Sequence, residues 1–145
     1  MPAQNLHVTI SFLGWVDDER VAEISRAVAT AVEGCARVPT VLAGLGTFPR
    51  ASRARVIWAG LQDEGGALAA VADRVQQGVA AIGFEPEARA WQAHVTLARL
   101  REPQRVDLNV MVEPIEFVVD AVVLFRSILR RPAPIYEPVA IATLA

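Results

Sequence analysis

Alternating polar and apolar residues predict a strand at residues 5–13. With a period of two, His7 and Thr9 fall on one face of this strand, and Val8 and Ile10 fall on the other. A strand of this kind can keep its apolar face on a core while its polar face meets water.

Two segments carry apolar residues at the spacing of an amphipathic helix. Residues 21–32 form the first segment and residues 68–79 the second, and Gly34 and Gly83 follow them as plausible helix stops. Further strands are expected at residues 38–45, 55–61, 91–98, 115–125 and 136–142, with a polar, proline-containing loop at 101–107.

The two halves of the chain share a faint internal similarity. Each half contains one amphipathic helix and one strand with the tripeptide His-Val-Thr, which starts at residue 7 and again at residue 94. We therefore predict a single α+β domain over residues 1–145 with two related lobes. Duplicated antiparallel sheets would be covered by helices on their outer faces and would enclose a central cleft between them.

Composition and charge narrow the class of protein. All 14 basic residues are arginine, the formal net charge is −2 and the isoelectric point is near 5.7, which argues against a protein that coats nucleic acid. A local arginine cluster that captures one phosphate-bearing end stays possible. The chain has no apolar run of the roughly 18 residues that span a bilayer, no signal-peptide pattern and a lone Cys35, so we expect a cytoplasmic protein.

The only two histidines, His7 and His94, both begin a His-Val-Thr motif. Positions i and i+2 of a strand share a face, so each imidazole is expected beside the hydroxyl of Thr9 or Thr96. Two imidazoles in one cleft suit in-line displacement at phosphorus, because one can deprotonate water while the other protonates the leaving oxygen. The threonine hydroxyls can bind the non-bridging oxygens, where charge gathers in the transition state.

Other interpretations of the histidines stay open at this point. A single histidine in a strand is usually structural, and two short tripeptides can recur by accident in a valine-rich chain. No metal site is expected, because neither histidine has another histidine, cysteine or carboxylate at ligand spacing. No cofactor is predicted either.

The paired motifs resemble the RNA 2′,3′-cyclic phosphodiesterases, the LigT-like branch of the two-histidine phosphoesterases. Segments 5–14 and 93–99 carry the resemblance, and residues 44–49, 56–60, 124–127 and Tyr136 extend it over nearly the whole chain. The resemblance implies metal-independent hydrolysis of a 2′,3′-cyclic phosphate at an RNA end to a 2′-phosphate. In some members it also implies the joining of tRNA halves through a 2′,5′ linkage.

The same resemblance implies a role for each motif residue. His7 would protonate the leaving 3′ oxygen, His94 would activate water, and Thr9 and Thr96 would hold the phosphate. Family members open with a strand and a helix before the first histidine, whereas here only six residues precede it. The expectation is therefore one of two alternatives: the natural protein starts further upstream, or the first lobe lacks a strand. A missing strand would leave a bare edge that invites pairing with another chain.

Several residues outside the motifs are candidates for contact with RNA. The resemblance favours phosphate contact for Arg99, but strict alternation places it on the face opposite His94 unless a bulge intervenes. Phe48 could stack on a terminal base or anchor its loop, and Arg50 and Arg53 could steer phosphates or simply be solvated. Arg126, Arg130 and Arg131 allow the same two interpretations.

Two rival functions remain. The first is a non-catalytic protein that binds RNA ends, and the second is a phosphodiesterase for another small cyclic phosphodiester. Turnover of a cyclic nucleotide separates the first rival from the enzyme, and relative rates on RNA ends and small diesters separate the second.

Overall fold

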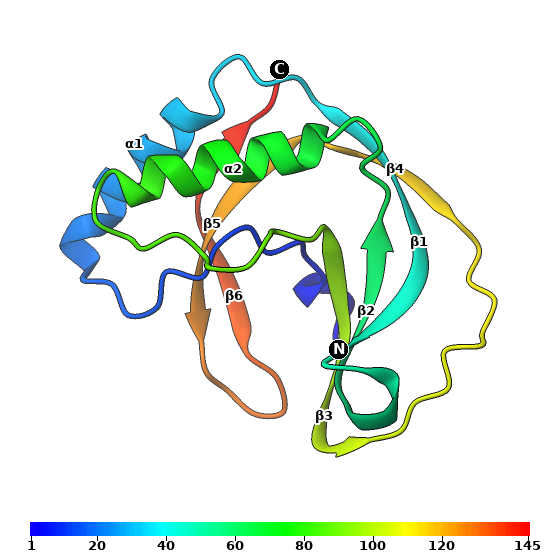
Figure 1. Ribbon diagram of the computed structural model, residues 1–145. Coiled ribbons are helices and arrows are strands. Elements are labelled where there is room, and N and C mark those ends of the chain that lie inside the picture. Colours follow the sequence, from blue (N-terminus) through cyan, green and yellow to red (C-terminus); the bar gives the residue numbers. More distant parts are fainter.

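Two antiparallel sheets and two helices make up the fold, which confirms the predicted α+β class (Figure 1). The computed structural model describes residues 1–145. One sheet has four strands in the order β3-β2-β1-β4, and the other pairs β5 with β6. The strands are β1 (Val38–Phe48), β2 (Ala54–Leu61), β3 (His94–Gln104), β4 (Ile115–Val119), β5 (Ala121–Ile128) and β6 (Ile135–Thr143).

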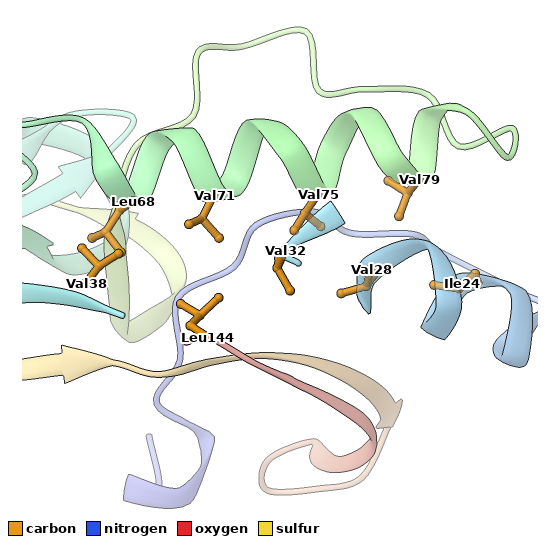
Figure 2. Packing of buried hydrophobic residues seen from close by; sticks show 9 residues of the cluster. All are labelled: Ile24, Val28, Val32, Val38, Leu68, Val71, Val75, Val79 and Leu144. Atoms are coloured by element: carbon orange, nitrogen blue, oxygen red, sulfur yellow. The ribbon is translucent and has the colours of Figure 1, made fainter. Parts of the chain in front are cut away.

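The core lies where the two helices, α1 (Val21–Ala31) and α2 (Ala67–Ala80), pack against each other and against strand ends. Both helices present one apolar stripe to this core, as their sequence spacing predicts. Figure 2 shows the nine buried residues of the cluster: Ile24, Val28, Val32, Val38, Leu68, Val71, Val75, Val79 and Leu144. Neither helix is long and apolar enough to cross a membrane.

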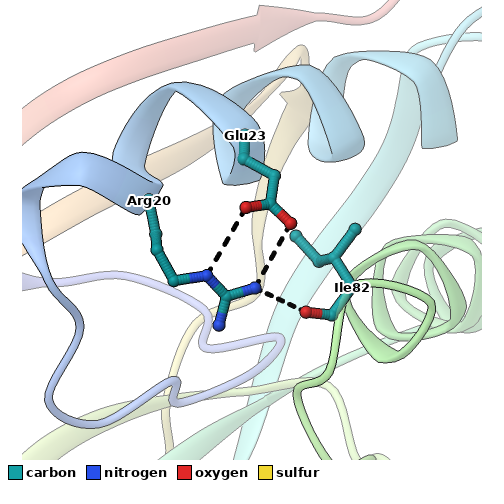
Figure 3. A network of polar contacts seen from close by, with 3 residues as sticks. All are labelled: Arg20, Glu23 and Ile82. Atoms are coloured by element: carbon teal, nitrogen blue, oxygen red, sulfur yellow. Dashed lines mark hydrogen bonds and ion pairs between the residues drawn. The ribbon is translucent and has the colours of Figure 1, made fainter.

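Polar contacts fix the ends of the two helices. The carboxylate of Asp63 accepts hydrogen bonds from the backbone N–H groups of Leu68 and Ala69, both at 2.9 Å, so it satisfies two free donors of the first turn of α2. Arg20, just before α1, pairs with Glu23 at 3.3 Å and also donates to the carbonyl of Ile82, just after α2 (Figure 3). The start of α1 is thereby joined to the end of α2.

The predicted strand at residues 5–13 is wrong. This segment is extended but pairs with the sheet at one position, an antiparallel bridge between Val8 and Val95. Side chains satisfy two of its other backbone groups: Trp91 donates to the carbonyl of Thr9 at 2.9 Å, and Gln76 of α2 donates to that of Ile10 at 3.0 Å. The segment is therefore extended and has a polar and an apolar face, but it does not form the continuous backbone hydrogen bonds of a strand.

Two further boundaries differ from the prediction. β3 continues through the expected loop to Gln104, because Ala54 at the start of β2 still pairs with it. The long apolar segment at 115–125 is two strands, since the chain leaves the larger sheet at Asp120 and enters the smaller one. Apolar residues lie on both sides of the single Asp120, and this pattern does not reveal that the two flanks pair in different sheets.

Candidate active site

The two His-Val-Thr motifs lie side by side. The antiparallel bridge joins their middle residues, Val8 on the N-terminal segment and Val95 on β3. In this register His7 stands opposite Thr96, and Thr9 stands opposite His94, all on the face away from the two valines. Directly opposite residues have Cβ atoms about 4.5–5.5 Å apart, and diagonal ones such as the two histidines about 7–8 Å.

Both imidazoles are oriented by the same kind of hydrogen bond. Nδ1 of His7 lies 2.6 Å from the carbonyl oxygen of Asn5, and Nδ1 of His94 lies 2.8 Å from that of Gln92. In each case the acceptor belongs to the residue two positions earlier. A carbonyl can only accept, so Nδ1 carries the hydrogen in both rings and Nε2 is left to exchange a proton.

Each imidazole packs against two aromatic rings. His94 lies 5.3 Å from Phe48 of β1 and 6.0 Å from Trp58 of β2, measured between ring centroids. His7 lies 5.0 Å from Tyr136 of β6 and 6.1 Å from Phe125 of β5. The larger sheet therefore holds one histidine and the smaller sheet the other, which gives the site its two-sided character.

Trp58 reaches His94 because the strand beside it has no side chain at the facing position. Gly46 of β1 pairs with Trp58, and a Cβ atom built on Gly46 would overlap the indole ring. The ring of Phe48 also packs against the indole, with a distance of 5.4 Å between ring centroids. Trp58 Nε1 is buried and has no hydrogen-bond partner. The indole is therefore held by packing alone, and its position depends on the space that Gly46 leaves free.

A bulge in β3 decides the orientation of Arg99. Trp58 pairs with Thr96 and Val56 pairs with Arg99, so β3 has one more residue than β2 between these pairs. Val56 and Trp58 share a face of β2, and Arg99 consequently shares the face of Thr96 and His94. Strict alternation placed Arg99 on the face opposite His94. The bulge in β3 places it on the same face instead.

The other candidate residues lie at different distances from the motifs. Phe48 packs against His94, so it is part of the site itself. Arg50 and Arg53 lie on the exposed turn between β1 and β2, and neither forms an ion pair or contacts a histidine. Ser11 is half-buried on the N-terminal segment.

Sequence reasoning missed five residues that position the histidines. Asn5 and Gln92 supply the carbonyls that orient the imidazoles. Trp58, Phe125 and Tyr136 pack on the rings. Trp58 is half-buried and lies on the same side of the sheet as His94.

The chain is similar to known proteins over most of its length. Residues 1–129 match the family model described as the 2′-5′ RNA ligase superfamily. The RNA 2′,3′-cyclic phosphodiesterase of Aeropyrum pernix is 35% identical over 141 residues, covering 92% of this chain and 79% of that protein. Its namesake from Thermotoga maritima is 27% identical, covering 92% and 73%.

Solved structures show the same fold. Escherichia coli LigT in its apo form is 25% identical, with a TM-score of 0.78, covering 100% of this chain and 79% of that one. The protein TT0787 of Thermus thermophilus is 25% identical, with a TM-score of 0.75, covering 99% and 80%. The LigT-like fold expected from the sequence is confirmed.

Proposed function

The chain belongs to the 2′-5′ RNA ligase superfamily and is a phosphoesterase of that family, and on this basis we propose that His7 and His94 hydrolyse RNA 2′,3′-cyclic phosphate ends. The observation that carries the proposal is the Val8–Val95 bridge, because it sets two similarly oriented imidazoles diagonally across one face. The names of the relatives from A. pernix and T. maritima support the substrate class.

The proposed reaction needs one imidazole in each protonation state. Neutral His94 takes a proton from water through Nε2 as the water oxygen bonds to phosphorus. The bond from phosphorus to the 3′ oxygen breaks, and His7, as imidazolium, gives its Nε2 proton to that oxygen. The product is a 2′-phosphate with a free 3′ hydroxyl. Both roles are compatible with the Nδ1–H bonds to Asn5 and Gln92, which stay intact in either protonation state.

Thr9 and Thr96 are proposed to hold the phosphate between the imidazoles. In the antiparallel register each hydroxyl faces the opposite histidine, so the pair flanks the position where a phosphate would sit. Hydroxyl donors aimed at the non-bridging oxygens stabilise the charge that develops there. Arg99, on the same face after the bulge, is proposed to bind the same phosphate or the one beside it.

The same residues would accept a ribose 5′ hydroxyl in place of water, which would join two RNA ends through a 2′,5′ linkage. The description of the matching family model supports this second activity. It shares every proton transfer with hydrolysis, and only the attacking oxygen differs.

The decisive experiment is turnover of a nucleoside 2′,3′-cyclic phosphate in the presence of EDTA. We expect a 2′-phosphate product and a bell-shaped dependence of kcat/KM on pH, because one histidine must be neutral and the other charged. His7→Ala and His94→Ala should each lower kcat by roughly 10²–10⁴-fold while the unfolding midpoint stays near that of the wild type. Arg26→Gln, an exposed change on α1, is the control.

Each rival predicts a different result. A protein that only binds RNA ends would retain the labelled oligonucleotide without forming product. A phosphodiesterase for another cyclic diester would turn over that small diester faster than an RNA end. Full activity in either alanine variant would exclude the acid–base pair.

A further inference from the structure

An open hollow of about 760 Å³ lies away from the histidines and is lined by Arg101, Arg131 and Pro132. Arg101 belongs to β3, whereas the other two belong to the loop between β5 and β6. Figure 1 shows that the far end of β3 and this loop lie at the same end of the molecule, opposite the helices. The hollow therefore lies between parts of the two sheets, and two of its three lining residues are arginines.

Arg101 lies on the strand that carries His94 and Thr96. It follows Arg99 by two residues, in the segment between the pairs Val56–Arg99 and Ala54–Gln104 where the register shifts a second time. Thr96 and Arg99 pair with β2 residues only two positions apart, so at about 3.3 Å per residue Arg101 is at most roughly 13 Å along the strand from Thr96. Neither histidine lines the hollow, so a phosphate bound there is a different one from the terminal cyclic phosphate.

The loop that carries Arg131 is tied to the other histidine. The side-chain amide of Asn5, which is only 5% exposed, donates a hydrogen bond of 2.9 Å to the carbonyl of Pro134 in this loop. The backbone carbonyl of the same Asn5 accepts the Nδ1–H bond of His7. One buried residue thus holds the loop and the imidazole in a fixed relation.

Neither arginine of the hollow is neutralised within the protein. Of the 14 arginines, only Arg20 and Arg126 form ion pairs with carboxylates. Two unpaired guanidinium groups from different sheets that line one hollow suit the charge and the oxygens of a phosphodiester.

From these observations we propose that Arg101 and Arg131 together bind a backbone phosphate upstream of the reacting end, so that the enzyme prefers oligoribonucleotides to mononucleotides. The proposal rests on the proposed function and extends it to the length of the substrate. Because the contact is with a phosphate, it selects for chain length and not for base sequence.

The test compares two substrates with the same reacting end. These are a nucleoside 2′,3′-cyclic phosphate and a six-nucleotide RNA that ends in that nucleoside 2′,3′-cyclic phosphate. The wild type should have the higher kcat/KM on the hexamer. Arg101→Gln and Arg131→Gln should each lower the hexamer value about three- to tenfold, mainly through KM, and leave the mononucleotide value unchanged. Arg26→Gln, which makes the same change in charge on α1, should alter neither.

The salt dependence of RNA binding is a second measurement. It would not change if the two arginines had only a structural role. Binding of a labelled hexamer with a 2′-phosphate end is measured by anisotropy at several salt concentrations. Removing one phosphate contact to a single strand should reduce the slope of log K against log salt by about 0.7, and the double variant by about twice that.

The possible failures are distinguishable. Absence of turnover on both substrates overturns the proposed function, while the anisotropy slopes still test the arginine pair. Turnover of the mononucleotide without a preference for the hexamer overturns the arginine pair alone. Equal losses on both substrates, or the same loss in Arg26→Gln, would overturn it as well.

Discussion

At the scale of single residues, the sequence predicted the four motif side chains but not what holds them. His7, Thr9, His94 and Thr96 could be named because a period of two puts each histidine beside its threonine. The orientation of Arg99 could not, since it depends on one extra residue in β3 that no alternation pattern reveals. The packing of aromatic rings on the imidazoles likewise depends on strands that are distant in the chain.

The first prediction concerns Gly46, where a methyl group has no room. In Gly46→Ala the new Cβ overlaps the indole of Trp58, so the ring must move away from its place beside His94. We expect destabilisation by about 1–3 kcal/mol, a change in tryptophan fluorescence and a fall in kcat. Urea denaturation, emission spectra and steady-state kinetics measure these effects.

Gly65→Ala is the matched control for this change. A Cβ at Gly65 meets nothing within 4 Å, and its backbone needs no positive φ. The control should keep the spectrum and the rate of the wild type. If Gly46→Ala also kept both, the indole would not be positioned by the glycine.

At the scale of elements, the helices were predicted well and the strand ends poorly. Apolar spacing located both helices because each buries one stripe in the same core. Periodicity alone fails at the N-terminal segment. Its polar and apolar residues alternate, but two of its backbone carbonyls accept hydrogen bonds from the side chains of Trp91 and Gln76. Which partner satisfies a backbone group is a property of tertiary structure and not of local sequence.

The second prediction tests the cap of α2. Asp63→Ala removes both oxygens that accept from the N–H groups of Leu68 and Ala69. The free energy of unfolding should fall by about 1 kcal/mol, within a range of about 0.5–2 kcal/mol. Denaturant unfolding monitored by circular dichroism measures the change.

Glu64→Ala serves as the comparison for the cap. Glu64 is exposed, directly follows Asp63 and makes no hydrogen bond or ion pair. Since α2 lies on the core side of the sheets, mononucleotide turnover per folded molecule should be the same in both variants. A loss of stability as large in Glu64→Ala as in Asp63→Ala would show that charge, and not capping, sets the effect.

At the scale of the whole molecule, the two sheets meet at the N-terminal segment. This segment pairs with β3 of the larger sheet at Val8 and contacts β5 and β6 of the smaller sheet through His7. The duplication in the sequence predicted two related halves, yet one sheet has four strands and the other two. The two matching tripeptides therefore indicate the symmetry of the site only. The number of strands in each sheet depends on other parts of the chain.

The last prediction addresses the residue that connects these parts. Asn5→Ala leaves the carbonyl of Pro134 without its donor and frees the loop between β5 and β6. Because the unpaired group is buried, we expect a loss of about 1–3 kcal/mol in the free energy of unfolding. The backbone carbonyl that orients His7 is retained in the variant, so kcat on the mononucleotide should fall less than in His7→Ala. On the hexamer, KM should also rise, because the loop that carries Arg131 is no longer held. Gln4→Ala, its exposed neighbour, should change none of these quantities. An Asn5→Ala protein with wild-type stability and an unchanged KM for the hexamer would show that the two sheets are held in register by other contacts.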